Sequence, residues 1–250
     1  MATLCFYKEI NITPFILLSL GFMTSLHSSP LHKTIFFDFD GTLSRGDSGW
    51  RFLLFCLRLR NIPRILLCLL WVLKEFFLGK MDKNKFKECC FGSVFKGRSL
   101  KEIFYLGERF VENRLQGNVL LVETMQRLEK HKAQGDRCIL VSASLGEYLQ
   151  FWAAKNGFET VIATRLEVGL DGRATGRFKG KNCYGSQKVV RILNYLKEEK
   201  FPKNSVAYGN SKGDFEMLQA TLEQDGKSWF VLPNGKVQSW KELSRKNLKG

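Results

Sequence analysis

A chain of 250 residues, 44% of them hydrophobic, is long and apolar enough to bury one large core or a core with a smaller inserted domain. Its formal charge of +15 favours an anionic partner, such as nucleic acid, an acidic lipid surface or a phosphorylated substrate. Seven cysteines form an odd set without a C-x-x-C pair, so neither a disulfide framework nor a zinc site is expected, and reduced thiols favour a cytoplasmic setting.

Residues 1–30 form an extension ahead of the predicted catalytic domain. Between Glu9 and Lys33 there is no charged residue, and Phe15–Met23 has the length of a signal-peptide apolar segment. This run is too short for a confident membrane span, and no clean cleavage site follows it. Three interpretations stay open: a signal or anchor, a disordered extension, or sequence upstream of the true start. The catalytic domain is expected to begin near Leu31.

The first functional motif follows a short apolar strand, Ile35–Phe37. This strand ends in two carboxylates, Asp38 and Asp40, which strand alternation places on the same side of the chain. Two carboxylates at the end of a buried strand are costly unless something offsets their charge. Ligands bind at the carboxyl ends of strands in open α/β sheets. A simple turn or cap would account for either Asp alone but poorly for the pair.

Helical periodicity then continues through residues 47–118. Gly49–Leu59 and Ile62–Leu78 are apolar around almost the whole helix, whereas Asp82–Phe95 and Ser99–Leu115 are more polar. From Gly49 to Lys74 there is no acidic residue, against five basic ones: Arg51, Arg58, Arg60, Arg64 and Lys74. Basic residues bounding apolar helices suggest that residues 49–78 contact an anionic membrane surface. The alternative is a set of helices buried against one another.

The next elements continue the alternation of helix and strand. Glu123–Gln134 is an amphipathic helix, and Asp136–Ser144 is an apolar strand that ends in small hydroxyl residues, among them Ser142. Gly146–Lys155 is predicted to be a helix, and a short strand and a hairpin follow it. This order of elements predicts a parallel sheet.

The helix predicted at Ser186–Lys200 carries Lys188 in its first turn, where the helix dipole disfavours a lysine. That mild conflict suggests a role in a site, although a solvated surface lysine is the alternative. Lys179 and Lys181 are rival candidates for the same role.

Asn204–Tyr208 is a further predicted strand, and the segment after it contains Asn210 and Asp214. Trp229–Leu232 supplies a last strand. The tail from Lys236 onward is basic and is expected to be solvated.

These segments resemble, in order, the four signatures of the haloacid dehalogenase superfamily. The run D-x-D-G-T at 38–42 is the closest match, and the resemblance implies that Asp38 is the nucleophile and Asp40 the general acid and base. Dehalogenating members lack the second Asp, so the resemblance implies phosphoryl transfer. It also implies phosphate binding by Thr42, Ser142 and Lys188.

The resemblance further implies a magnesium site at Asp38, the backbone carbonyl of Asp40, Asn210 and Asp214. Asn210 stands where the family usually has an aspartate. An amide oxygen is a weaker ligand for a hard cation than a carboxylate. This departure bears on metal affinity and on activity itself.

The predicted fold is a doubly wound parallel α/β sheet with an inserted helical-bundle cap, as in the phosphoserine-phosphatase-like branch. Residues 31–46 and 119–250 would form the catalytic core, and residues 47–118 the cap. The predicted function is Mg²⁺-dependent phosphomonoester hydrolysis through an aspartyl-phosphate. The apolar cap resembles that of phosphatidylglycerophosphatase C-type enzymes, which implies a phospholipid head group such as phosphatidylglycerol phosphate as substrate.

This resemblance implies a cytoplasmic enzyme that is peripheral at the inner face of the membrane. Two alternatives remain: a phosphatase of a small soluble phosphate, such as phosphoserine, and a catalytically weak phosphate- or lipid-binding protein. Nucleic acid is not expected as a partner.

Overall fold

A six-stranded sheet in the order β3-β2-β1-β6-β7-β8 forms the centre of the described chain. β8 is antiparallel to β7, and the other neighbouring strands are parallel. The strands are β1 (Thr34–Phe37), β2 (Arg137–Leu145), β3 (Thr160–Thr164), β6 (Val206–Gly209), β7 (Lys227–Val231) and β8 (Val237–Ser239). Because β1 lies between β2 and β6, the carboxyl ends of these three strands adjoin at one edge. The predicted fold class is confirmed.

The computed structural model describes residues 32–58, 61–80 and 82–247. The interpretations of residues 1–30, and Arg60 within the basic series, lie outside these residues. In the described ranges, no helix is both long and apolar enough to cross a membrane.

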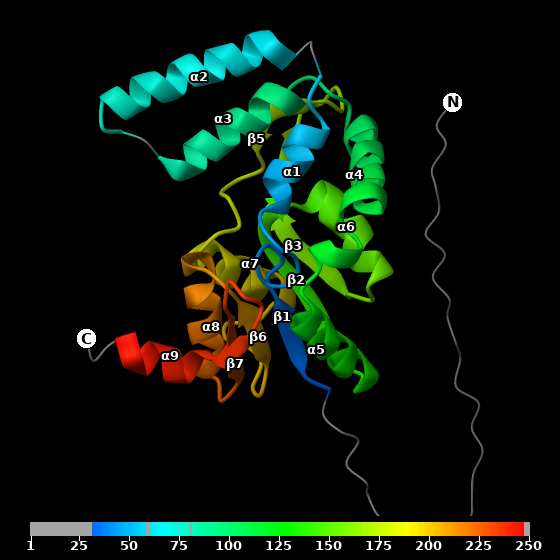
Figure 1. Ribbon diagram of the computed structural model, residues 1–250, viewed down its shortest axis with the longest axis vertical. Helices are drawn as coiled ribbons and strands as arrows, with labels where there is room; N and C mark the ends of the chain where they lie inside the picture. The colour runs from blue at the N-terminus through cyan, green and yellow to red at the C-terminus, as the bar shows by residue number, and fades with distance from the viewer. Residues whose placement is uncertain (1–31, 59–60, 81, 248–250) are drawn as a thin grey trace, which may run out of the picture. The chain divides into compact units, whose positions relative to one another are not determined.

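Helices cover both faces of the sheet (Figure 1). α5 (Val122–Ala133) and α6 (Gly146–Lys155) pack on one face, and three helices pack on the other. Those three are α7 (Ser186–Leu196), α8 (Phe215–Leu222) and α9 (Trp240–Asn247). Strand alternation sends the adjacent Phe36 and Phe37 into the cores on opposite faces. A strand buried on both faces needs an unbroken apolar run, which Ile35–Phe37 supply in β1.

A helical insert of four helices separates β1 from β2 (Figure 1). Its helices are α1 (Ser48–Phe55), α2 (Ile62–Phe77), α3 (Lys83–Phe95) and α4 (Leu100–Arg114). Ser99 is the N-cap of α4, as the sequence predicted. A small hairpin, β4 (Leu166–Val168) and β5 (Ala174–Phe178), packs against α3. The four predicted helices are confirmed, whereas the division into a core and a cap stays a prediction.

The insert is joined to the core through aromatic packing. Phe52 of α1 contacts Phe110 of α4, with ring centroids 5.2 Å apart, and Tyr148 of α6, at 4.7 Å. Gly107 of α4 packs so closely on α6 that a Cβ there would lie 2.7 Å from the Glu147 carbonyl oxygen. These contacts hold α1 and α4 against the edge of the sheet where β1 and β2 end.

The prediction of a solvated C-terminal tail is wrong within the described residues. β8 and α9 form there, and Trp240 is only 8% exposed. Its ring lies 4.5 Å from that of Phe215 and 5.7 Å from that of Phe230. The polar composition of this segment concealed the one aromatic side chain that anchors it. The helix predicted at Ser186–Lys200 is also shorter, because Lys197 adopts a left-handed conformation that ends α7.

Candidate active site

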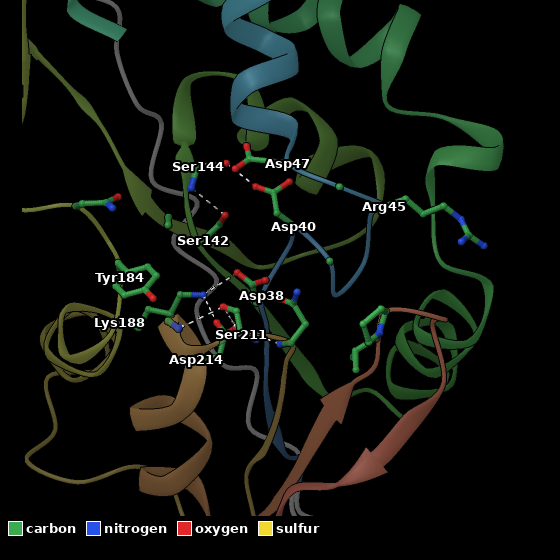
Figure 2. Close-up of a pocket in the computed structure, with 18 of the residues that line it drawn as sticks. Asp38, Asp40, Arg45, Asp47, Ser142, Ser144, Tyr184, Lys188, Ser211 and Asp214 are labelled. Carbon is green, nitrogen blue, oxygen red and sulfur yellow. Dashed lines mark hydrogen bonds and ion pairs between the residues drawn. The ribbon is translucent and has the colours of Figure 1, made fainter. Parts of the chain in front are cut away.

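A cavity of about 770 Å³ opens where β1, β2 and β6 end (Figure 2). Six of the predicted site residues line it: Asp38, Asp40, Ser142, Lys188, Asn210 and Asp214. Thr42 is fully buried beside them. The fold therefore brings together all the residues that the four sequence signatures nominated. Lys179 and Lys181, the rivals of Lys188, are exposed and do not line this cavity.

Lys188 lies between two aspartates (Figure 2). Its Nζ donates to Asp38 Oδ1 and to Asp214 Oδ1, each at 2.6 Å, and to the Val141 carbonyl oxygen at 3.0 Å. All three donors of the ammonium group are thus engaged. The side chain is 1% exposed, so the first turn of α7 directs this lysine beneath the cavity and not into solvent.

The charges of this cluster stabilise one another. Burial lowers the pKa of Lys188, but the carboxylates of Asp214 and Asp38 outweigh burial and raise it overall, so the amine stays protonated. Burial and the neighbouring Asp214 raise the pKa of Asp38 to about 7, while the Lys188 ammonium opposes that rise. Additional positive charge at this site would favour the ionised Asp38 that a nucleophile requires.

Asp40 occupies a separate position on the same cavity wall. Its Oδ1 accepts a hydrogen bond from the backbone N–H of Ser48 at 2.7 Å, and its Oδ2 accepts one from Ser144 Oγ at 2.5 Å. Burial raises the pKa of Asp40, and repulsion from Asp47 adds to the rise. A carboxyl group with a raised pKa can carry a proton and later release it, which is the property a general acid and base needs.

Thr42 and Ser142 complete the predicted phosphate-binding set. Thr42 Oγ1 donates to Asp38 Oδ2 at 3.1 Å and so holds the carboxylate in one orientation. Ser142 Oγ accepts the N–H of Ser144 at 3.0 Å, and Ser142 lines the cavity at the end of β2. Gly41 has a φ of +78°, and a Cβ there would overlap the Asn210 side chain. Only glycine permits this close turn after β1.

The Asn210 amide supports the predicted cation site. One terminal atom of this amide lies 2.9 Å from the Asp40 carbonyl oxygen and 3.3 Å from Asp38 Oδ2. With its nitrogen there, the amide donates hydrogen bonds to both oxygens. With its oxygen there, the amide would join the Asp40 carbonyl oxygen and Asp38 Oδ2 as a third oxygen of the kind that Mg²⁺ prefers. The donors of Asp38, Asp40 and Asn210 therefore fit a magnesium ion.

Asp214 fits the cation less directly. Its Oδ1 binds Lys188, and its Oδ2 accepts hydrogen bonds from the backbone N–H groups of Asn210 and Ser211 and from Ser211 Oγ. Among the described residues, no group of three His, Cys, Asp or Glu side chains is arranged to hold a metal ion. A cation here would depend on the Asn210 amide and the Asp40 carbonyl as well as on carboxylates.

Sequence reasoning missed two groups that line the cavity, Ser144 and Lys87, and one behind it, Ser48. Ser144 and Ser48 bind Asp40, and Lys87 of α3 reaches the cavity from the helical insert. The hydroxyl pair at 142 and 144 was a readable signal, because two Ser side chains end the same strand. Lys87 gave no signal, since nothing in a polar helix distinguishes it from its neighbours.

Two known proteins resemble this chain in sequence. Protein CicA of Caulobacter vibrioides is 29% identical over 190 residues, which span 75% of this chain and 82% of CicA. A histidinol-phosphatase of Neisseria meningitidis serogroup C is 28% identical over 108 residues, covering 41% of this chain and 49% of that enzyme.

A solved structure also resembles this fold. A Bordetella pertussis Tohama I protein described as having unknown function is 26% identical, with a TM-score of 0.61, over 76% of this chain and 87% of that one. The family model for haloacid dehalogenase-like hydrolases matches residues 35–219, from β1 through most of α8. The chain is therefore an enzyme of the haloacid dehalogenase-like hydrolase family, as its four signatures predicted.

Proposed function

We propose that this chain hydrolyses phosphomonoesters through a phosphorylated Asp38. The observation that carries the proposal is the buried Lys188 held between Asp38 and Asp214 at the base of the cavity. A carboxylate oxygen of Asp38 would attack phosphorus and form an acyl phosphate, while the bond from phosphorus to the leaving oxygen breaks. Asp40 would donate its proton to that oxygen, so that the leaving group departs as an alcohol.

The second half of the reaction regenerates the enzyme. The Asp40 carboxylate would take a proton from a water molecule as that water attacks phosphorus, and the bond to Asp38 would break to release inorganic phosphate. Lys188, Thr42 and Ser142 would orient the nucleophile and the phosphoryl oxygens throughout. Mg²⁺, bound by Asp38, Asp40 and Asn210 with Asp214 beside them, would neutralise charge on the phosphoryl group.

The exposed face of α2 supports a substrate at a membrane surface. Cys68 is the one buried residue of this helix. Eight apolar side chains of α2 are 47–81% exposed: Ile62, Leu66, Leu67, Leu69, Leu70, Leu73, Phe76 and Phe77. Most of them recur at helical spacing on one side, so they form an outward apolar stripe. We therefore favour an interfacial role over mutual burial of these helices, and a phospholipid head group such as phosphatidylglycerol phosphate as substrate.

The basic side chains near α2 are partly occupied by contacts within the protein. Arg58 lies 3.1 Å from Glu102, and Arg64 Nη1 donates to the Lys96 carbonyl oxygen at 2.6 Å. These arginines can still attract an anionic surface, although the apolar stripe would supply most of the binding. The protein would then sit peripherally at the membrane, with α2 in the interface.

A second candidate function is hydrolysis of a small soluble phosphate. The likeness to a histidinol-phosphatase favours it, since that name describes a phosphatase of a small molecule. The two candidates share the same chemistry at Asp38 and differ in what the helical insert contacts.

Trapping the phosphoenzyme tests the proposed reaction. The full chain is incubated with p-nitrophenyl phosphate, with Mg²⁺ or with EDTA, and is then quenched in acid. Borohydride reduction of the acyl phosphate followed by peptide mass spectrometry should locate homoserine at position 38, in the Mg²⁺ sample only. Asp38→Asn should give neither hydrolysis product nor homoserine at position 38. Asp225→Asn, on the exposed surface, should behave like the wild type. Turnover by a folded Asp38→Asn protein would contradict the mechanism.

A further inference from the structure

Lys87 is a cation of the cavity wall that the proposed mechanism does not use. Its Nζ donates to the carbonyl oxygen of Ala143 at 3.0 Å, and its side chain is half-buried. Within the described residues, no carboxylate forms an ion pair with it. An ammonium group carries three donors, so at least one is left for a ligand. A half-buried charge with no counter-ion in direct contact is costly, so an anion that binds beside it would be favoured.

The other cations of the cavity cannot serve the same purpose. Lys188 is neutralised by two aspartates. Arg45 is exposed, and Figure 2 shows its side chain pointing away from Asp38 and Asp40. Burial lowers the pKa of Lys87, while Asp47 and Asp40 act in the opposite direction. Among the described residues that line the cavity, Lys87 is therefore the partly buried cation with no carboxylate in direct ion-pair contact, and Asp47 and Asp40 act on it only from a distance.

The position of Lys87 indicates which part of a substrate it would meet. Its acceptor, Ala143, precedes Ser144, and Ser144 donates to Asp40. Asp40 is the group proposed to protonate the leaving oxygen, so Lys87 lies on the side of the cavity where the leaving group must sit. The phosphoryl group itself would be bound at the other side, by Lys188 and the groups around Asp38.

The helix that carries Lys87 is fixed on both sides of this residue. Asn84 Oδ1 accepts a hydrogen bond from Asn182 Nδ2 at 3.0 Å, and Glu88 Oε1 accepts one from the Phe178 N–H at 2.7 Å. These contacts tie α3 to segments of chain beyond β3. The ammonium group is thereby held in place before a ligand binds, which reduces the entropy lost on binding.

We propose that Lys87 binds a second negative charge on the leaving group, and so selects phosphomonoesters whose alcohol portion is itself an anion. This inference rests on the proposed phosphatase function. A phosphodiester or a carboxylate close to the transferred phosphate would satisfy it, and the phosphodiester of a phospholipid head group is one such anion. Lys87 would act on substrate choice and not on the bond-breaking step.

The test compares esters that differ in the charge of the leaving group. The substrates are glycerol 3-phosphate, which has a neutral leaving group, 3-phosphoglycerate, which adds a carboxylate, and the deacylated head group glycerophosphoglycerol phosphate, which adds a phosphodiester. The full chain should prefer the charged esters in kcat/KM by about tenfold or more, which is typical of a hydrogen bond to a charged group. The ester that is preferred identifies the anion.

The variants separate substrate recognition from a structural role. Lys87→Met should reduce the ratio of kcat/KM between charged and neutral esters to near one, mainly through KM, and Lys87→Arg should restore part of it. Lys85→Met is the matched control, because Lys85 is an exposed lysine of the same helix that does not line the cavity, and it should keep the wild-type ratio. Equal losses of kcat/KM on charged and neutral esters, with their ratio unchanged, would show that Lys87 only links α3 to Ala143 and does not bind the leaving group.

Direct binding keeps this inference separate from the proposed reaction. Dissociation constants of 3-phosphoglycerate and glycerol 3-phosphate are measured by calorimetry for Asp38→Asn, with and without Lys87→Met. A preference for the charged ester that disappears with Lys87 supports the inference even where turnover is absent. Equal dissociation constants of the two esters for Asp38→Asn with Lys87 intact would overturn the inference, whether or not the chain hydrolyses phosphate esters.

Discussion

Lys188 Nζ and Asp38 Oδ1 lie 2.6 Å apart, although 150 residues separate them in the chain. The ion pair is buried, and it forms because α7 and β1 meet at the same edge of the sheet. A buried ion pair is costly to form and is more costly to break from one side. This pair therefore links the stability of the fold to the proposed chemistry.

Replacing Lys188 by Met should destabilise the protein and abolish activity. The substitution leaves Asp38 and Asp214 facing each other without a counter-ion, and such a change typically costs about 3–5 kcal/mol in the free energy of unfolding. Urea denaturation would measure the loss. Lys200→Met, which changes an exposed lysine, is the control and should stay within about 0.5 kcal/mol of the wild type. An unchanged unfolding free energy in Lys188→Met would mean that the ion pair contributes little.

Replacing Asn210 by Asp should strengthen magnesium binding. The new carboxylate would lie beside the Asp40 carbonyl oxygen and Asp38 Oδ2, so it adds attraction for a hard cation and repulsion when no cation is present. The variant should melt at a lower temperature in EDTA and gain more in melting temperature from Mg²⁺ than the wild type gains.

Asn204→Asp is the matched control for Asn210→Asp, because it adds the same charge at an exposed position. Thermal denaturation over a magnesium titration would compare the three proteins. Coincident titration curves for Asn210→Asp and the wild type would remove Asn210 from the coordination sphere.

Glu147 should make stability depend on pH. It is buried, its Oε1 accepts the Leu166 N–H at 2.9 Å, and its Oε2 has no hydrogen-bond partner among the residues that the structure describes. Burial raises its pKa in the folded state, so the unfolded chain loses this proton first, and stability should fall as pH rises above the unfolded value of about 4.3. Glu147→Gln removes the titration.

The difference in unfolding free energy between Glu147→Gln and the wild type should therefore shift in favour of the variant between pH 4 and pH 7, a range that begins below the unfolded pKa. Urea denaturation at the two pH values would measure this shift. Glu198→Gln, at an exposed position, should show no such shift. A difference that stays constant with pH would place the Glu147 titration outside this range.

The apolar stripe of α2 should bind membranes. Replacing Leu66, Leu70 and Leu73 by Gln removes three exposed leucines and should release the protein from vesicles containing an anionic phospholipid, because each buried leucine contributes about 1.5–3 kcal/mol. Co-sedimentation of protein beginning at Leu31 would measure binding. Leu170→Gln, in the turn between β4 and β5, should bind like the wild type.

A second variant of α2 tests the contribution of charge. Replacing Arg58 and Arg64 by Gln should weaken binding chiefly at low salt, by about 1 kcal/mol for each residue. Equal sedimentation of all these proteins, or none by the wild type, would favour the soluble-phosphate candidate.

The sequence by itself determined most of the elements before the C-terminal segment, and the first half of the site. An apolar run that ends in Asp38 and Asp40 specifies a strand end and a pair of carboxylates, because both features depend on neighbouring residues. The helices of the insert and the N-cap at Ser99 were equally local, so periodicity and capping patterns were enough to predict them.

Tertiary structure decided what these elements contact. It selected Lys188 over Lys179 and Lys181, placed Ser144 on Asp40, brought Lys87 into the cavity and turned the leucines of α2 outward. It also buried Trp240 in a segment whose composition predicted a solvated tail. Each of these outcomes depends on which side chains meet across distant parts of the chain. Hydrophobic periodicity carries no information on such tertiary contacts, because it describes one element at a time.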